Sequence, residues 1–511
     1  MILGESRHTA GSAATLDDLF RRAGVRHPDA IALVDPPNRE EFTDSAPRTL
    51  TFAEADRAIS ALAARLRGLG LQTDAPVAVQ LPNTVEGLIT VLATLRAGMI
   101  AVPMPLLWRQ QEIVAALGRV GAKAIVTTAR IGSLSYADIA MRAAVDLFQI
   151  RHVCAFGNNL PDGVTSLDGI FTSDDDDLTP AFPRPGVAAA HVAAITFDLD
   201  ASGLVVPIAR SHVELVAGGL ETFLETDGSP DRPLLSTIPV SSFAGIALTA
   251  LPWLLTGGTL HLHHSFNPKT FAAQVRELAN GAVILPAATV VPIADAGLLA
   301  GNIQTVVALW RSPERLSAAK VWQGFATVID VACFGETGLI AARRSANGLP
   351  VQILYGAADA TRRPTGAPTV VQTTRTVGGT LALRGRMVPT HSYLPAAERS
   401  PHSRLTSDQA GYVDTGFACH VERNGQALAV TTSPPGFTSI GGYRFLQSDI
   451  DELVAQADPT ATIVALPDVD LGLRMAGSAE HRDALCAKLQ ARGTNPLITG
   501  AFRPRRGIEA A

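Results

Sequence analysis

The sequence predicts an α/β protein. We expect a large N-terminal domain, built from two parallel-sheet α/β subdomains plus a small β-rich subdomain, and then a small α+β C-terminal domain. Three observations predict this division. The 511 residues exceed the usual size of one domain. Helical and strand patterns alternate over most of the chain, which is typical of parallel sheets covered by helices. From about residue 349 the pattern changes to short strands with Gly and Pro turns.

We place the first α/β subdomain at residues 1–186. Residues 51–70 have apolar positions at helical spacing, residues 75–83 indicate a buried strand, and residues 84–104 a helix followed by a strand. An acidic, Pro-rich passage that contains Asp174–Asp177 ends this subdomain. A divalent-metal site and a solvated linker are the two alternatives for this run. The linker is favoured because metal ligands rarely come as a bare run of charges.

We place the second α/β subdomain at residues 187–348, the β-rich subdomain at 349–430 and the C-terminal domain at 431–511. Residues 233–268 contain no Asp, Glu, Lys or Arg, which raises the question of a membrane helix. Such a helix needs about 20 unbroken apolar residues. Pro239, Pro252 and a Gly-Gly pair interrupt this segment. It therefore predicts a buried helix followed by a buried strand, and no membrane span.

Composition narrows the class of protein. A formal net charge of −5 argues against a nucleic-acid-binding surface. The N-terminus lacks the basic and apolar segments of a signal peptide, so we expect a cytoplasmic protein. His261, His263 and His264 crowd one strand end, but their spacing is poor evidence for zinc. The four cysteines are far apart and predict reduced structural thiols; they are Cys154, Cys333, Cys419 and Cys486.

Four segments carry a family pattern in their order and spacing. They are LPNTVEGLITVLATLRAGMIAVPM (81–104), IPVSSFAGIALTALPWLLTGGTLHLH (238–263), GGTLALRGRMVP (378–389) and GFTSIGGYRFLQSDIDELV (436–454). Together they resemble the adenylate-forming (AMP-binding) superfamily of acyl-CoA synthetases, luciferases and peptide-synthetase adenylation domains, over nearly the whole chain. The resemblance implies ATP with Mg²⁺ and coenzyme A as cofactors. It also implies a small carboxylic acid or acyl-thiol as ligand, and a carrier protein as a further acceptor.

The family's nucleotide loop, of the type TSGTTGxPKG, corresponds to a stretch within Ala194–His212, AITFDLDASGLVVPIARSH. By this resemblance Ser202 and Gly203 keep the expected residue types of the loop. Ser211 is a candidate N-cap of the helix that follows.

The other positions of this loop depart from the family. Asp198 and Asp200 stand among the first loop residues, and Val206 stands at the place of the family's lysine. A phosphate cradle needs free N–H groups, hydroxyl donors and a cation. Two carboxylates with no lysine to offset them therefore predict an impaired phosphate site.

A second nucleotide motif, YGxTE, is resembled by residues 334–338. The resemblance assigns Phe334 to stacking on adenine and Gly335 and Thr337 to the phosphate. Gly338 replaces the family's metal-binding glutamate, which leaves Glu336 as the candidate magnesium ligand. An ordinary turn at a strand end is the alternative reading of these residues.

Further along the chain, more groups of the family are replaced. Phe417 takes the place of the ribose-binding aspartate of the TGD motif, and the adjacent Asp414 points to the opposite strand face. Pro434 and its neighbour stand in the hinge, where they restrict the backbone. Ala501 takes the place of the catalytic lysine. Nearby arginines could supply charge or form a solvated basic tail, and the tail is favoured; they are Arg503, Arg505 and Arg506.

The resemblance also gives candidates for the acyl and thiol pocket. Ser242 stands at the family's gating histidine and Gly245 at the glycine of the same motif. Gly441 and Gly442 would edge the thiol tunnel. Two functions remain: a divergent acid–thiol ligase with weakened or lost adenylation, and a non-catalytic relative that binds acyl or CoA ligands as a regulator or subunit. Thiol transfer from an acyl-adenylate made elsewhere is an intermediate possibility.

Overall fold

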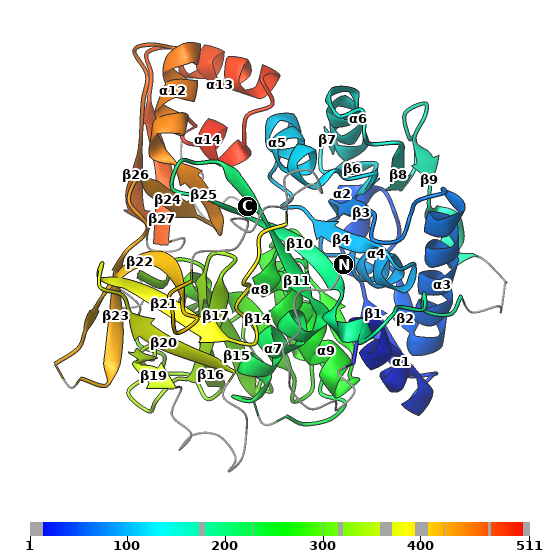
Figure 1. Ribbon diagram of the computed structural model, residues 1–511, viewed down its shortest axis with the longest axis horizontal. Coiled ribbons are helices and arrows are strands. Elements are labelled where there is room, and N and C mark those ends of the chain that lie inside the picture. Colours follow the sequence, from blue (N-terminus) through cyan, green and yellow to red (C-terminus); the bar gives the residue numbers. More distant parts are fainter. Residues whose placement is uncertain are drawn as a thin grey trace.

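The computed structural model describes residues 14–172, 179–226, 228–299, 301–314, 320–357, 370–393, 407–423, 425–468 and 472–503. Two large sheets with helices around them form most of the molecule, a β-rich sheet flanks them, and a smaller C-terminal unit lies at one end (Figure 1). The run Asp174–Asp177, for which a linker was predicted, lies outside the described residues.

The first large sheet has seven strands in the order β11-β10-β4-β3-β5-β8-β9. Neighbouring strands are parallel, except that β10 and β11 form an antiparallel hairpin at one edge. The parallel strands are short, apolar and buried, as expected for strands covered on both faces. Their bounds are β3 Pro76–Val79, β4 Ile100–Pro103, β5 Ala124–Thr128, β8 His152–Phe156, β9 Thr165–Ser166, β10 Val192–Leu199 and β11 Val205–Ser211.

The second large sheet has eight strands in the order β17-β16-β15-β14-β12-β13-β1-β2. Its six inner strands are parallel neighbours, and β17 and β2 are antiparallel edges. The bounds are β1 Ile31–Val34, β2 Thr49–Thr51, β12 Leu234–Ser236, β13 Leu260–Leu262, β14 Ala282–Pro286, β15 Thr305–Trp310, β16 Thr327–Phe334 and β17 Gly338–Arg343.

The two sheets exchange strands across the boundary expected between residues 186 and 187. The N-terminal strands β1 and β2 complete the second sheet, whereas the hairpin β10–β11 completes the first. A strand joins the sheet whose edge it can hydrogen-bond, and the sequence pattern does not say which edge is free. Each large sheet therefore contains strands from both sides of residue 186, and no single cut in the chain separates the two α/β subdomains.

Several helices begin at a residue whose side chain caps the helix. Helix α3 (Phe52–Gly68) starts at Thr51 with a capping box to Glu54. Helix α7 (His212–Phe223) starts at Ser211, the predicted N-cap, with a capping box to Glu214. The other helices that cover the two sheets are α1 Leu16–Arg26, α2 Arg39–Thr43, α4 Val85–Arg96, α5 Gln110–Val120, α6 Tyr136–Asp146, α10 Pro268–Glu277 and α11 Ala287–Asp295.

The helical part and the strand of the charge-free segment 233–268 are largely buried, as predicted, whereas Ser265 and Phe266 near its end are exposed. It forms α8 (Phe243–Gly245), a π-helical turn (Ile246–Ala250), α9 (Leu251–Thr256) and strand β13. Trp253 of α9 is fully buried, and its ring lies 5.8 Å from that of Phe20 and 6.2 Å from that of Phe52. Among the described residues, no helix has both the length and the apolar character needed to cross a membrane.

The β-rich sheet has the order β18-β23-β22-β21-β20-β19. Its strands are β18 Ile353–Leu354, β19 Gly356–Ala357, β20 Val371–Arg375, β21 Thr380–Gly385, β22 Val413–Val421 and β23 Ala427–Thr432. Residues 433–436 then connect to the C-terminal unit, which is orange and red in Figure 1. Its elements are β24 Phe437–Ile440, β25 Tyr443–Leu446, α12 Gln447–Ala457, β26 Thr462–Asp468, β27 Gly472–Ser478, α13 Arg482–Ala491 and α14 Pro496–Gly500.

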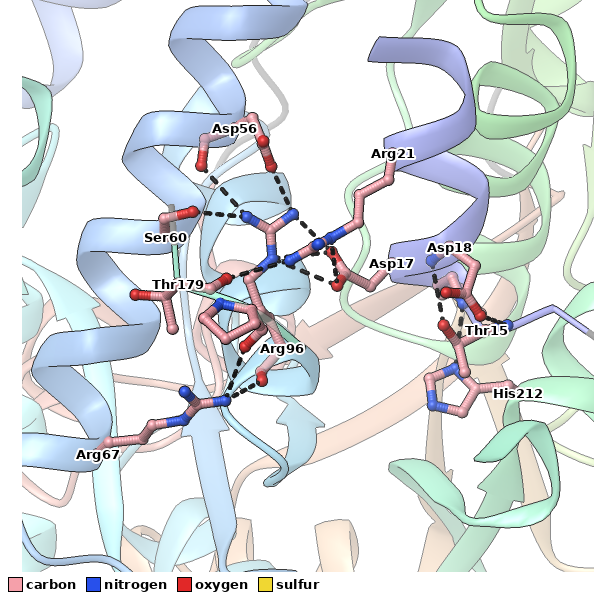
Figure 2. Close-up of polar contacts among 12 residues, drawn as sticks. Thr15, Asp17, Asp18, Arg21, Asp56, Ser60, Arg67, Arg96, Thr179 and His212 are labelled. Carbon is pink, nitrogen blue, oxygen red and sulfur yellow. Dashed lines mark hydrogen bonds and ion pairs between the residues drawn. The ribbon is translucent and has the colours of Figure 1, made fainter. Parts of the chain in front are cut away.

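A buried ion network joins the first helices of the chain (Figure 2). The side chain of Arg96, at the end of α4, is fully buried. Its guanidinium pairs with Asp17 of α1 at 2.7 Å and with Asp56 of α3 at 2.6 Å, and it donates to Ser60 Oγ at 2.8 Å. Arg21 pairs with the other oxygen of Asp17. The network therefore fixes α1, α3 and α4 relative to one another.

We expect protonation of His212 to make the protein less stable at acidic pH. His212 Nδ1 accepts the N–H of Leu16 at 3.2 Å, and burial lowers the pKa of His212 from 6.5 to about 3. The unfolded chain therefore binds a proton that the folded chain excludes as the pH falls below about 6.5. Between pH 6.5 and 5 this group should lower the free energy of unfolding by about 2 kcal/mol.

The measurement is urea unfolding at several pH values. His212→Asn, which keeps an acceptor near Leu16, should reduce the slope of stability against pH in this window. His27→Asn removes an exposed histidine and should leave the slope unchanged. Equal slopes for the wild type and His212→Asn would contradict the expectation.

Candidate functional site

A cavity of about 690 Å³ lies between the large domain and the C-terminal unit. It opens at the carboxyl ends of the parallel strands β12, β14, β15 and β16, which is where α/β sheets commonly bind ligands. The residues that end or follow these four strands line it: Thr237, Pro286, Arg311 and Gly335. The hairpin β10–β11 and the turn between β24 and β25 also contribute to its wall. Its volume is that of a small-molecule site.

The hairpin turn at residues 200–204 stands where the nucleotide loop was expected. Asp200 Oδ1 accepts the N–H of Ser202 at 2.9 Å, the Ser202 hydroxyl at 2.6 Å and the N–H of Leu204 at 3.1 Å. The N–H of Gly203 donates to the Asp200 carbonyl at 2.9 Å. Partial burial works against the charge of Asp200, but these hydrogen bonds lower its pKa below the usual value. The hydrogen-bond donors of the turn are therefore taken up by Asp200 of the same turn, mainly by its charged carboxylate.

Asp198 connects three parts of the chain at the edge of the cavity. Its Oδ2 accepts the N–H of Glu336 at 2.9 Å, and its Oδ1 accepts the N–H of Leu199 at 2.8 Å. Arg444 Nη1, from β25 of the C-terminal unit, donates to Oδ1 at 2.6 Å. Both side chains are mostly buried, with 12% of Asp198 and 15% of Arg444 exposed.

Arg444 corrects one expectation. The sequence offered no lysine to offset the loop carboxylates, but this arginine, 246 residues after Asp198, neutralises one of them. Its guanidinium also lies 5.2 Å from the ring of Phe417 and 5.7 Å from that of Phe437. In the sequence, the available signal for this arginine was its position directly after Gly-Gly-Tyr in the segment that opens the C-terminal domain.

The Asp198–Arg444 ion pair lies directly on Gly335. The φ angle of Gly335 is +56°, in the left-handed region that favours glycine. A Cβ atom at this position would lie 2.2 Å from Asp198 Oδ2 and 2.9 Å from Arg444 Nη1. Gly335, which was predicted to face the phosphate, thus lines the cavity. The Asp198–Arg444 ion pair covers the side of Gly335 from which a Cβ atom would project.

Phe334 and Thr337 take places that differ from those predicted. Phe334 is buried in the core, where its ring meets that of Phe417 at 5.5 Å and almost at a right angle. The ring is therefore not placed to stack on a base in the cavity, and the adenine role expected for it needs a rearrangement. Thr337 donates its N–H to the Phe334 carbonyl at 3.0 Å, as in an ordinary turn at a strand end.

Glu336 lines the cavity and is tied to the protein by hydrogen bonds. Its Oε2 accepts the N–H of Phe243 at 3.0 Å, and its carbonyl accepts from the guanidinium of the buried Arg210. Burial raises the pKa of Glu336 above its usual value. No group of three or more His, Cys, Asp or Glu side chains that could hold a metal occurs in the described part of the chain. The magnesium role of Glu336 thus stays a prediction without a ligand set around it.

Three of the four predicted pocket residues line the cavity. Ser242 caps α8 by accepting the N–H of Gly245 at 3.1 Å. Gly441 and Gly442 form the turn between β24 and β25 with φ angles of +56° and +89°, which a two-residue hairpin turn of this hand requires. Gly245 has a packing role instead, because a Cβ there would lie 2.0 Å from the carbonyl oxygen of Pro239.

Cys333 lines the cavity but is not suited to nucleophilic chemistry. Its thiol donates to the Gly335 carbonyl at 3.2 Å, and burial raises its pKa to about 12. The thiolate, which is the reactive form of cysteine, is therefore scarce at neutral pH.

The remaining predicted positions lie in the β-rich sheet and near the C-terminus. Phe417 is buried, whereas Asp414 is exposed and accepts from Thr380 Oγ1, in line with the predicted opposite faces. Ala501 is the C-cap residue directly after α14. Of the arginines near it, Arg503 is the last described residue, and Arg505 and Arg506 lie outside the described residues.

The C-terminal unit makes further contacts with the large domain around the cavity. The N–H of Leu107 donates to the Tyr443 hydroxyl at 3.2 Å, and Asn495 Nδ2 donates to Glu112 Oε1 at 2.9 Å. In the connecting segment, Ser433 Oγ donates to a carboxylate oxygen of Glu314 at 2.8 Å. These bonds hold the unit in the arrangement that encloses the cavity.

Comparisons with known proteins agree with this fold. A family model described as AMP-binding enzyme matches residues 20–299. The chain is 26% identical over 291 residues to the 2-hydroxy-7-methoxy-5-methyl-1-naphthoate–CoA ligase of Streptomyces carzinostaticus, covering 55% of this chain and 50% of that protein. It is 28% identical over 228 residues to the feruloyl-CoA synthase of an Amycolatopsis species, covering 45% and 42%. The chain thus spans about half the length of these curated relatives.

A solved structure extends the likeness of fold beyond the matched part. The amide bond synthetase McbA from Marinactinospora thermotolerans superposes with a TM-score of 0.68 over 94% of each chain, at 18% sequence identity. At this identity the likeness concerns the fold alone.

Proposed function

The chain belongs to the AMP-binding enzyme family, and we propose that it is a divergent acyl-CoA synthetase-like member whose ATP-dependent adenylation is weakened or lost. In this proposal its cavity binds a small carboxylic acid or an acyl-thiol. One observation carries the proposal: the carboxylates of Asp198 and Asp200 accept hydrogen bonds from N–H groups in and beside the hairpin that would otherwise be available to phosphate.

Electrostatics supports the proposal. A triphosphate is bound by free N–H groups and a cation. Here the hairpin donors already serve carboxylates, and the nearby cation, Arg444, already serves Asp198. A polyanion entering this place would meet the carboxylate of Asp200 beside the ion-paired carboxylate of Asp198, and like charges at contact distance cost on the order of kcal/mol even in water. The hairpin and the residues bound to it therefore do not fit the triphosphate of the nucleotide that the family uses.

The replaced groups serve different steps, which argues against local compensation. Val206 stands at the phosphate lysine, Gly338 at the metal glutamate, Phe417 at the ribose aspartate and Ala501 at the catalytic lysine, by the family resemblance. Removing one charge-stabilising group of this kind commonly costs roughly 10²–10³ in rate. A compensating residue at one position would therefore leave the other steps impaired.

The experiment is ATP–pyrophosphate exchange with a panel of fatty and aryl acids, together with calorimetry of Mg·ATP binding. We expect no exchange above background and no binding at millimolar nucleotide. A family member that carries the lysine and the glutamate serves as the positive control. Exchange above background with any acid would refute the proposal and establish ligase activity.

The second class of ligand is an acyl-thiol, on coenzyme A or on a carrier protein. It is supported by the place of Gly441 and Gly442 in the cavity wall. A protein that binds such a ligand without activating it would act as a regulator or subunit.

A further inference from the structure

We propose that Arg311 is the anion-binding residue of the cavity and that its guanidinium holds the carboxylate of the bound acid in the absence of nucleotide. This inference rests on the proposed function, because it concerns the ligand of the same cavity. It names the cation that holds the ligand, and it requires neither ATP nor a thiol.

The guanidinium of Arg311 is available for a ligand. Arg311 is the first residue after β15, is partly buried, and lines the cavity. Within the described part of the chain its side chain makes one hydrogen bond, a long one of 3.5 Å from Nη2 to Ser242 Oγ. A guanidinium carries five N–H donors in a planar fork that matches a carboxylate. A partly buried cation with so few partners gains from a counter-ion.

The side chain of Arg311 is also held in place. A Cβ atom on Gly442 would lie 2.2 Å from Arg311 Cδ and 2.9 Å from Nη1, so the arginine crosses the backbone of the Gly-Gly turn at contact distance. Ser242 Oγ lies near the end of the side chain. A fixed guanidinium loses little freedom when a ligand binds, which favours affinity.

The other charged side chains that line the cavity have partners or face water. Asp198 and Arg444 pair with each other, and Asp449 is exposed. The remaining carboxylates accept hydrogen bonds from the protein: Glu336 from the N–H of Phe243, and Glu112 from the N–H of Arg109 and the amide of Asn495. Among the described residues that line the cavity, Arg311 is thus the cationic side chain that forms no ion pair with a carboxylate.

The rest of the wall sets the character of the ligand body. Apolar and aromatic side chains supply much of it and offer few donors to a second charged group: Trp108, Phe197, Ile238, Pro286, Ala287 and Leu309. A ligand with one anionic end and an apolar body satisfies both parts of the cavity.

The test is binding of simple acids to the full chain without nucleotide, followed by calorimetry and by the fluorescence of Trp108 and Trp310, which line the cavity. The probes are benzoate, 2-naphthoate and hexanoate, each paired with its neutral amide. We expect the acids to bind more tightly than the amides. Arg311→Gln should weaken acid binding about 10- to 100-fold and leave amide binding unchanged, because it removes a charge-assisted hydrogen bond.

The matched control is Arg142→Gln, which removes an exposed arginine of α6 and should bind the acids like the wild type. Thermal unfolding shows whether Arg311→Gln is folded. If it is not, Arg311→Lys keeps the charge without the fork and should weaken acid binding alone. Equal acid affinity in the wild type and the folded variant, amides that bind as tightly as acids, or no binding of any acid would each overturn the inference.

The two proposals fail separately. Pyrophosphate exchange together with Arg311-dependent acid binding would refute the loss of adenylation and leave the inference intact. No exchange together with acid binding that ignores Arg311 would refute the inference alone.

Discussion

Replacing Arg96 by methionine is expected to lower the free energy of unfolding by about 3–5 kcal/mol, the cost typical of breaking a buried ion pair. The Arg96 side chain is fully buried and pairs with Asp17, of which 4% is exposed, and Asp56, of which 20% is exposed. Methionine fills much of the same volume but leaves the carboxylate of Asp17 buried with Arg21 as its remaining cation. Urea unfolding at neutral pH measures the loss.

Two further variants separate charge from packing. Arg65→Met removes an exposed arginine of α3 and should change stability by no more than about 0.5 kcal/mol. Adding Asp17→Asn to Arg96→Met should recover part of the loss, since it removes a buried carboxylate whose remaining cation, Arg21, is partly exposed. A loss below about 1 kcal/mol for Arg96→Met would mean that the network does not hold α1, α3 and α4 together.

The second large effect is expected at the contact between the hairpin and the C-terminal unit. Arg444→Met leaves Asp198 mostly buried without its cation, and removing one partner of such a pair costs about 2–5 kcal/mol. We expect the cost to appear as loosened docking of residues 437–503. Amide hydrogen exchange should accelerate there and in the turn 200–204, but not in the parallel strands between residues 76 and 128.

The control for this prediction lies in the same unit. Arg482, the first residue of α13, is exposed. Arg482→Met should therefore leave the exchange pattern unchanged. The double variant Asp198→Asn with Arg444→Met measures the coupling energy of the pair. Unchanged exchange in Arg444→Met would show that the other contacts, at Tyr443 and Asn495, suffice for docking.

Local patterns predicted the elements well where a cap or a break fixed them. Ser211 begins α7, the strand and helix patterns of residues 75–104 became β3, α4 and β4, and the breaks in residues 233–268 separate α9 from β13. Each of these signals acts over a few residues, so the chain itself contains the information. The membership of β1 and β2 in the second sheet depends on which edge is free, and no local pattern states this.

For the candidate site, the sequence predicted which residues of the family motifs are replaced, because the residue type at a motif position is visible without a structure. It did not show that Arg444 pairs with Asp198, that Phe334 packs in the core against Phe417, or that Arg311 lines the cavity with one long hydrogen bond.

The sequence by itself determined the family, the α/β class and the start of α7 at Ser211, and it predicted the replacement of the phosphate lysine by Val206, since each depends on residue types at short spacing. The tertiary structure alone decided what fills the nucleotide place and what is left for a ligand. Charges 246 residues apart find each other only when the C-terminal unit folds onto the hairpin. The physical reason is that an ion pair or a free cation is defined by distance in space, which the order of residues does not fix.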